Sequence, residues 1–157
     1  MNFLSATLRL CGLIFVAAVF ASAQVPAPKD TLGFTPGDDR KLASWAQVVD
    51  YFKMLDAASE RMVFEVIGKT TMGAPFVYAT VSSPANLKAL AKYRNINDKL
   101  ADPRKIKSND AAAKRLVAEG KTIVLITFGI HSTEVGSTLS SMLIAHELAS
   151  SNDARIK

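Results

Sequence analysis

Apolar residues after position 40 recur first with the period of a helix and then with that of β-strands. A helical period predicts an amphipathic helix of about four turns from Lys41, with Asp38 or Asp39 as its N-cap. Its apolar positions are Leu42, Trp45, Val48, Val49, Phe52 and Leu55.

Two β-rich runs follow, "RMVFEVIG" (61–68) and "APFVYATVS" (74–82). The short stretch "KTTMG" between them ends in glycine, which is typical of the loop of a β-hairpin. Ser83 followed by Pro84 forms an N-cap and first-turn pair, so a second helix is expected after the hairpin.

A charged loop over 97–110 contains Pro103, and Ser108 or Asn109 then caps a short helix that ends at Gly120. "KTIVLITFG" (121–129) contains five consecutive apolar or β-branched residues, which predict a strand buried on both faces. A last helix is expected from Glu134 to about Ser150. This order of elements predicts an α/β fold in which a mixed β-sheet is flanked by helices.

The first 23 residues have the pattern of a secretory signal peptide. Arg9 precedes an apolar run from Leu10 to Phe20, and the small-x-small sequence of residues 21–23 precedes Gln24. The run covers about eleven residues, whereas a membrane span needs roughly twenty, so no permanent membrane anchor is expected. The protein is therefore expected to be exported, to the periplasm or the extracellular space, and residues 24–40, rich in proline and glycine, to form an extended leader.

Charge and cysteine content bear on two properties of the chain, nucleic-acid binding and disulfide bonding. The formal net charge of +5 falls to +4 without Arg9, and the basic residues form no long run and are not interleaved with aromatic residues. This pattern indicates a solvated basic surface and gives no sign of nucleic-acid binding. The single cysteine, Cys11, lies in the signal segment, so disulfide bonds are not expected to stabilise the exported chain.

The candidate chemistry lies in "TFGIHSTEVGS" (127–137), where the predicted strand gives way to the last helix. In open α/β sheets, ligands bind beyond the carboxyl ends of strands. His131 and Glu134 stand there with a spacing that lets an imidazole nitrogen and a carboxylate oxygen reach one divalent cation in a tight turn. Taken alone, the pair also fits a surface loop in which Glu134 favours the start of the next helix through the helix dipole.

The stretch "GIHSTE" resembles the glycine-x-histidine-x-x-glutamate signature of the zinc carboxypeptidases, the carboxypeptidase A-like metallopeptidases. The order of the predicted elements from about Leu42 to the C-terminus is similar to that of bacterial secreted members. The resemblance implies that residues 41–157 are the N-terminal part of a zinc carboxypeptidase-like catalytic domain. It also implies that His131 and Glu134 are two ligands of Zn²⁺ and that the protein is a metalloprotease acting on peptide or protein substrates near a chain end.

The resemblance also implies groups that this chain is expected to lack. The family completes its site with a histidine well downstream, and its general base and substrate-binding arginine are expected beyond Lys157. The other histidine, His146, stands twelve residues after Glu134 on the predicted helix, which advances about 18 Å over that distance, so a structural role is expected for it. The chain alone is therefore expected to be an inactive, truncated peptidase.

Two other functions fit the same residues. A zinc amidohydrolase that deacylates N-acyl amino acids would use a similar pair, but such enzymes usually carry glycine directly after the histidine, where this chain has Ser132. A secreted α/β binding module without chemistry would use Glu134 only to cap a helix. Metal content and substrate preference separate these alternatives.

Overall fold

The structure is a computed structural model and describes residues 24–156. The expected signal peptide and Cys11 lie outside the described residues. In chain order the elements are α1 (Pro28–Leu32), α2 (Trp45–Ala58), β1 (Met62–Lys69), β2 (Pro75–Val81), α3 (Pro84–Lys88), α4 (Leu90–Ala101), the 3₁₀ helix η1 (Pro103–Ile106), α5 (Asp110–Glu119) and α6 (Val135–Ser150). Within residues 24–156, no helix is long and apolar enough to cross a membrane.

The β-hairpin predicted from the sequence is confirmed. Strands β1 and β2 pair antiparallel, with Met62 opposite Val81 and Phe64 opposite Ala79. The connecting turn is closed by a hydrogen bond from the Thr70 amide to the Ala74 carbonyl at 2.8 Å, and Gly73 supplies the positive φ of 78° that the turn requires. The hairpin is the only sheet in the described part of the chain.

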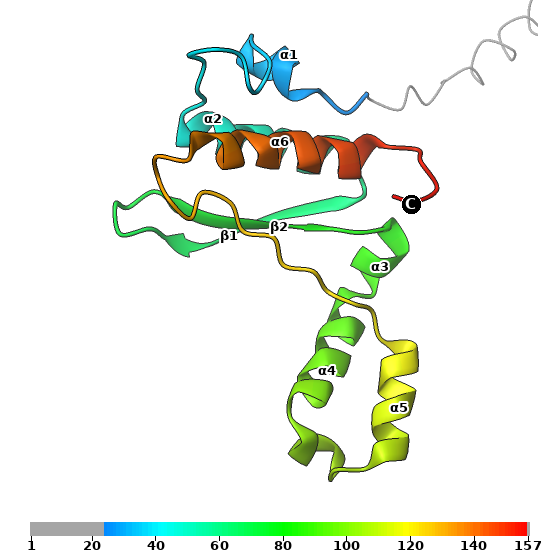
Figure 1. The fold of residues 1–157 in the computed structure, drawn as a ribbon. Coiled ribbons are helices and arrows are strands. Elements are labelled where there is room, and N and C mark those ends of the chain that lie inside the picture. Colours follow the sequence, from blue (N-terminus) through cyan, green and yellow to red (C-terminus); the bar gives the residue numbers. More distant parts are fainter. Residues whose placement is uncertain (1–23, 157) are drawn as a thin grey trace, which may run out of the picture.

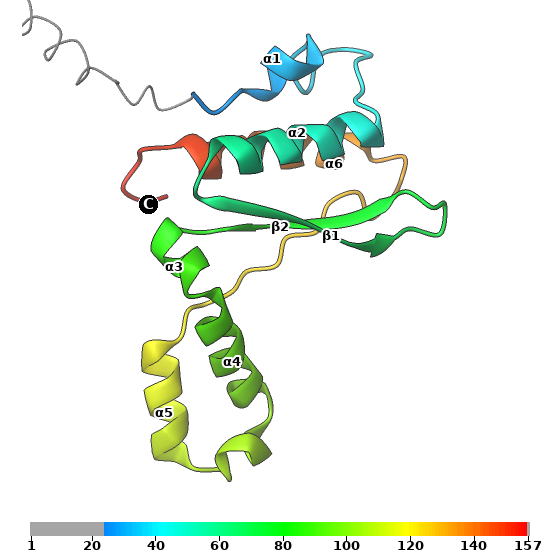
Figure 2. The ribbon, with the colours of Figure 1, turned by 180° about the vertical axis from the view of Figure 1, so that it is seen from behind.

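Helices α2 and α6 lie side by side across one face of this hairpin, as Figures 1 and 2 show from opposite sides. The core forms where the two helices meet the strands, because each element has one apolar side to bury. Tyr51, Leu55 and Met142 are fully buried there. The combination of helices with a sheet confirms the predicted fold class in its broad sense, but the predicted mixed sheet is not present in residues 24–156, where the sheet has two antiparallel strands.

The prediction of a buried central strand over residues 121–129 was wrong. This segment is extended but has no strand partner within the described part of the chain, and none of the backbone hydrogen bonds there involves residues 121–128. Its apolar side chains face solvent, and Leu125 is 83% exposed. The apolar run predicts burial, but burial needs a neighbouring strand, and β1 and β2 pair only with each other.

The start of the first long helix lies later than predicted. Ser44, and not Asp38 or Asp39, is the N-cap of α2, and it forms a capping box with Gln47. The Asp38 carboxylate instead accepts a hydrogen bond from the Thr35 amide at 2.9 Å and so closes a turn of the leader. The other predicted caps, Ser83 before α3 and Asn109 before α5, are confirmed.

The leader is not simply extended, because residues 28–32 form the short helix α1 between Pro28 at its first turn and Gly33 at its end. It also packs on the body of the protein: the Tyr51 hydroxyl donates a hydrogen bond to the Pro26 carbonyl at 3.0 Å. Burial, and to a lesser extent the charge of Asp30, raises the pKa of Tyr51 above its ordinary value. The hydroxyl therefore stays protonated and keeps this bond.

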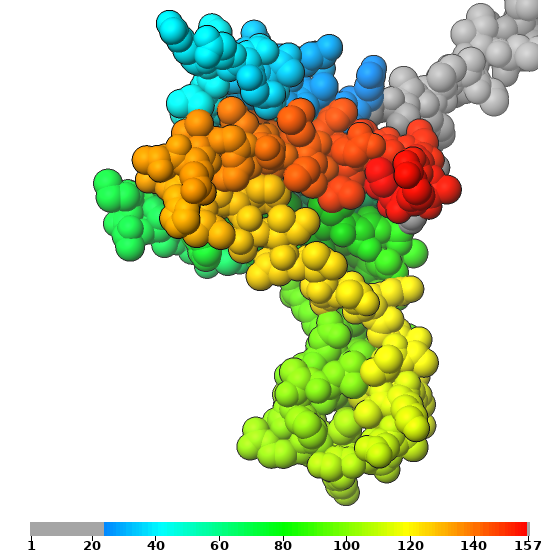
Figure 3. All heavy atoms as spheres, in the orientation of Figure 1, coloured from blue at the N-terminus to red at the C-terminus, as the bar shows by residue number. Residues whose placement is uncertain are grey.

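Helices α4 and α5, with η1 between them, project away from the hairpin and the two covering helices (Figures 1 and 3). We call residues 84–120 the helical arm. The charged stretch 97–110 at its far end was predicted as a loop, but α4 continues to Ala101 and η1 follows directly. The arm returns to the body through the extended segment 121–129, so the candidate site lies where the chain re-enters the body.

Candidate metal centre

The turn that carries the candidate site is held by hydrogen bonds on both sides. The Glu134 amide donates to the His131 carbonyl at 3.0 Å, which closes the loop ahead of α6. The Ser137 hydroxyl accepts from the Gly129 amide at 2.9 Å and donates to the Glu134 carbonyl at 3.1 Å. Ser137 thus ties the end of the extended segment to the first turn of α6, a role that the sequence did not predict.

The two side chains of the predicted pair face one another. His131 Nδ1 lies 3.0 Å from Glu134 Oε1, and both side chains are largely exposed, at 69% and 65%. Two ligands of a tetrahedral zinc ion, each about 2.1 Å from the metal, are separated by about 3.4 Å. The two atoms therefore stand somewhat closer than two ligands of one zinc ion, at the distance of a direct hydrogen bond.

Gly129 is required at the entry to this turn for two reasons. Its φ of 69° lies in the left-handed region, which residues with a Cβ adopt only at a cost. A Cβ at this position would also stand 2.9 Å from Thr138 Oγ1 on α6. Any other residue at position 129 would therefore strain the backbone and crowd Thr138.

The variant Gly129→Ala is expected to lower the free energy of unfolding by about 1–2 kcal/mol, the cost of a left-handed backbone with a Cβ. Gly136→Ala is the matched control, because a Cβ on Gly136 meets no atom within 4 Å and alanine favours the helix. Urea unfolding followed by circular dichroism measures both. Equal effects of the two changes would contradict the special role of Gly129.

Glu134 stands at the N-cap position of α6, but its carboxylate makes no capping hydrogen bond with that helix. The carboxylate contacts the His131 ring instead. The hydrogen bonds of the turn therefore do not include a helix cap by the Glu134 carboxylate. Glu134 keeps its second carboxylate oxygen free of protein hydrogen bonds in the described residues.

His146 makes a structural contact, in line with the role expected from the sequence. Its Nε2 lies 3.3 Å from the Val25 carbonyl of the leader. Within residues 24–156, no group of three or more His, Cys, Asp or Glu side chains gathers that could hold a metal ion. In this part of the chain the candidate centre is thus a pair.

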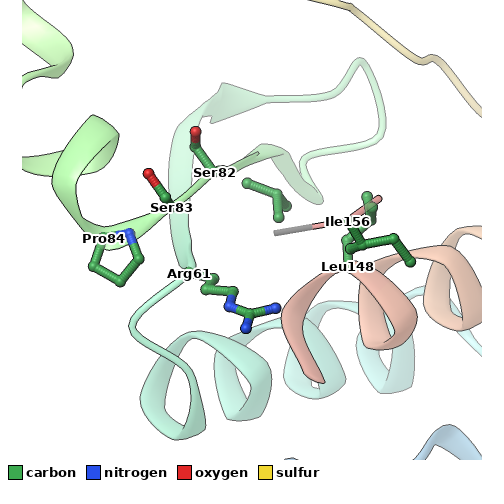
Figure 4. A pocket seen from close by; sticks show the side chains of 7 residues that line it. Arg61, Ser82, Ser83, Pro84, Leu148 and Ile156 are labelled. Carbon is green, nitrogen blue, oxygen red and sulfur yellow. The ribbon is translucent and has the colours of Figure 1, made fainter. Parts of the chain in front are cut away.

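The pair lies apart from a cavity at the edge of the core. A cavity of about 330 Å³ opens where the end of β2 meets the C-terminal end of α6, and neither His131 nor Glu134 lines it. Figure 4 shows the Arg61 side chain in this cavity near Leu148, with the Ser82 and Ser83 hydroxyls directed away from it. Arg61 donates a hydrogen bond to the Ser151 carbonyl, so this guanidinium holds the chain after α6 in place.

Comparison with known proteins found no matching family model, curated protein or solved structure. The interpretation of the pair therefore rests on its residues and their geometry.

Proposed function

We propose that His131 and Glu134 are two zinc ligands of an exported carboxypeptidase-like metallohydrolase, with residues 41–157 forming part of its catalytic domain. The observation that carries the proposal is the direct approach of the imidazole nitrogen to the carboxylate oxygen on a turn fixed by Gly129 and Ser137. The "GIHSTE" signature supports it from the sequence side. A neutral imidazole and a carboxylate are both common zinc ligands.

In the proposed activity, this chain holds and orients the metal. Zinc bound here would supply a Lewis acid and a water molecule of lowered pKa for hydrolysis of a peptide bond near a chain end. The hydrogen bonds of the turn fix the backbone that carries the imidazole and the carboxylate, and these two groups would hold the metal. The resemblance assigns the third ligand, the general base and the substrate-binding arginine to residues later than Lys157, and the chain alone is expected to have no peptidase activity.

The binding-module alternative places Glu134 at the start of a helix, and Glu134 is the N-cap residue of α6, although its carboxylate makes no capping hydrogen bond. The amidohydrolase alternative uses the same metal and differs in substrate. In the complete hydrolase, hydrolysis of N-acyl amino acids without hydrolysis of peptides would favour the amidohydrolase.

Glutamate-to-glutamine substitutions test the proposal on the chain from Gln24 onward, which contains the whole core cluster. Glu134→Gln is expected to weaken zinc binding by at least about tenfold, because it removes the charged ligand oxygen. Glu147→Gln is the matched control, since Glu147 is an exposed glutamate on α6. Isothermal titration with zinc measures both affinities.

The chain is expected to bind one zinc ion weakly, since two protein ligands leave the coordination incomplete. The proposal would be contradicted if the chain bound no zinc at the pair. It would also be contradicted if Glu134→Gln bound zinc as tightly as Glu147→Gln.

A further inference from the structure

The positive charge of the chain is concentrated in the helical arm. Residues 84–120 contain nine Lys or Arg and four Asp or Glu, whereas the rest of the chain contains ten of each. The whole net charge of +5 therefore belongs to the arm. Figures 1 and 3 show this arm standing out from the body, so its charges are presented away from the core and away from the candidate metal centre.

More than half of these basic side chains are not neutralised by the protein. Lys92, Arg94, Arg104 and Lys105 lie within 4.0 Å of a carboxylate. In the described part of the chain, the other five have no carboxylate within that distance: Lys88, Lys99, Lys107, Lys114 and Arg115. All of the five except Lys99 are exposed. Unpaired, exposed cations on a projecting element are available to an external anion.

Helix α5 combines this charge with apolar surface. Lys114 and Val117 are three residues apart and so are neighbours on the helix surface, and the Val117 side chain is 66% exposed. Basic residues beside exposed apolar residues are typical of helices that lie on membrane surfaces. Tyr93 is the one aromatic residue in 84–120, so the arm offers a single stacking side chain, whereas proteins that bind single-stranded nucleic acids stack successive bases on several aromatic residues.

We propose that the helical arm docks the protein on a surface of anionic phospholipid headgroups. Each Lys or Arg brought close to an anionic leaflet strengthens binding by about fivefold at low salt. The attraction acts within a Debye length, about 10 Å at 0.1 M salt, and a projecting element can bring several charges within this range while the body stays in solution. The docking is peripheral and does not depend on the proposed zinc site.

Two triple variants of the chain from Gln24 onward test this docking. The arm variant is Lys107→Gln, Lys114→Gln and Arg115→Gln. The control variant is Lys29→Gln, Lys41→Gln and Lys69→Gln, which removes three exposed lysines from outside the arm. Both lower the net charge by the same amount. Cosedimentation with vesicles of phosphatidylglycerol and phosphatidylcholine, and with vesicles of phosphatidylcholine alone, measures binding at 0.1 M and 1 M salt.

The unaltered chain is expected to bind the phosphatidylglycerol vesicles at 0.1 M salt and to be released at 1 M salt. Three arm charges correspond to a loss of about 100-fold in binding, whereas the control variant is expected to lose no more than about threefold. Equal losses in both variants would show that net charge alone acts, and would overturn the proposal. No preference for phosphatidylglycerol, or tighter binding to a DNA duplex than to the vesicles, would also overturn it.

Discussion

Replacing His131 by alanine is expected to remove zinc binding from the chain, with a loss of affinity of at least about 100-fold. Substitution of residues that merely orient a metal ligand costs 10- to 100-fold, and His131 is proposed as a ligand itself. Its Nδ1 is the nitrogen donor of the turn, and only the Glu134 carboxylate stands opposite it. Titration calorimetry, or competition with a chromophoric chelator, measures the change.

The second histidine of the chain provides the control. His146→Ala removes a contact with the leader at the Val25 carbonyl and is expected to leave zinc affinity unchanged. The double variant of His131→Ala and Glu134→Gln tests whether both side chains bind the same zinc ion. If one ion bridges both side chains, the second substitution costs little once the first has been made. Full additivity of the two losses, or equal losses for the two histidines, would contradict a shared site.

Leu55→Ala is expected to destabilise the protein strongly, by about 3 kcal/mol within a usual range of 2–5 kcal/mol. Leu55 lies on α2 and is fully buried, in the same core cluster as Met62 of β1 and Met142 of α6. Truncation removes apolar contacts and leaves a cavity that the two helices cannot close without shifting. Urea unfolding followed by circular dichroism gives the free energy directly.

Met54 is the matched control for this substitution, because it precedes Leu55 on α2 and is 39% exposed. Met54→Ala is expected to cost less than about 1 kcal/mol, since it removes little buried surface. Similar losses for Met54→Ala and Leu55→Ala would mean that α2 does not pack on the hairpin through the face that carries Leu55.

Local signals in the sequence predicted most of the helices and the hairpin. Ser83 with Pro84, Asn109 and Gly120 mark helix ends through hydrogen bonds and backbone preferences that act within a few residues. The start of α2 was misplaced because two aspartates stand ahead of Ser44 and are equally suited to capping by residue type. Only the structure shows that Asp38 is already used within the leader.

Long-range pairing was not predictable in this way. The run over 121–129 has the composition of a buried strand, but composition does not name its neighbour, and in residues 24–156 neither β1 nor β2 pairs with it. The leader shows the opposite case: its prolines and glycines indicate irregular structure, while its attachment through Tyr51 depends on residues 25 positions away.

For the candidate site, the spacing of His131 and Glu134 predicted that the two side chains can converge, and they do so at 3.0 Å. The spacing did not reveal what fixes the turn. Ser137 acts through its hydroxyl across eight residues, and the need for glycine at 129 depends on the position of Thr138 in α6. Both are properties of how the helix docks on the preceding segment.

The exposed segment 121–128 also makes the chain prone to aggregation. Seven of its eight residues are Ile, Val, Leu, Thr or Phe in an unbroken run from 122 to 128, and the segment contains no proline, glycine or acidic residue. Such a run has the composition from which amyloid-like stacks form, and its unpaired backbone offers a template for them. A chaperone that binds extended apolar peptides is therefore expected to bind this segment. A high concentration of the chain would favour aggregation through the same segment.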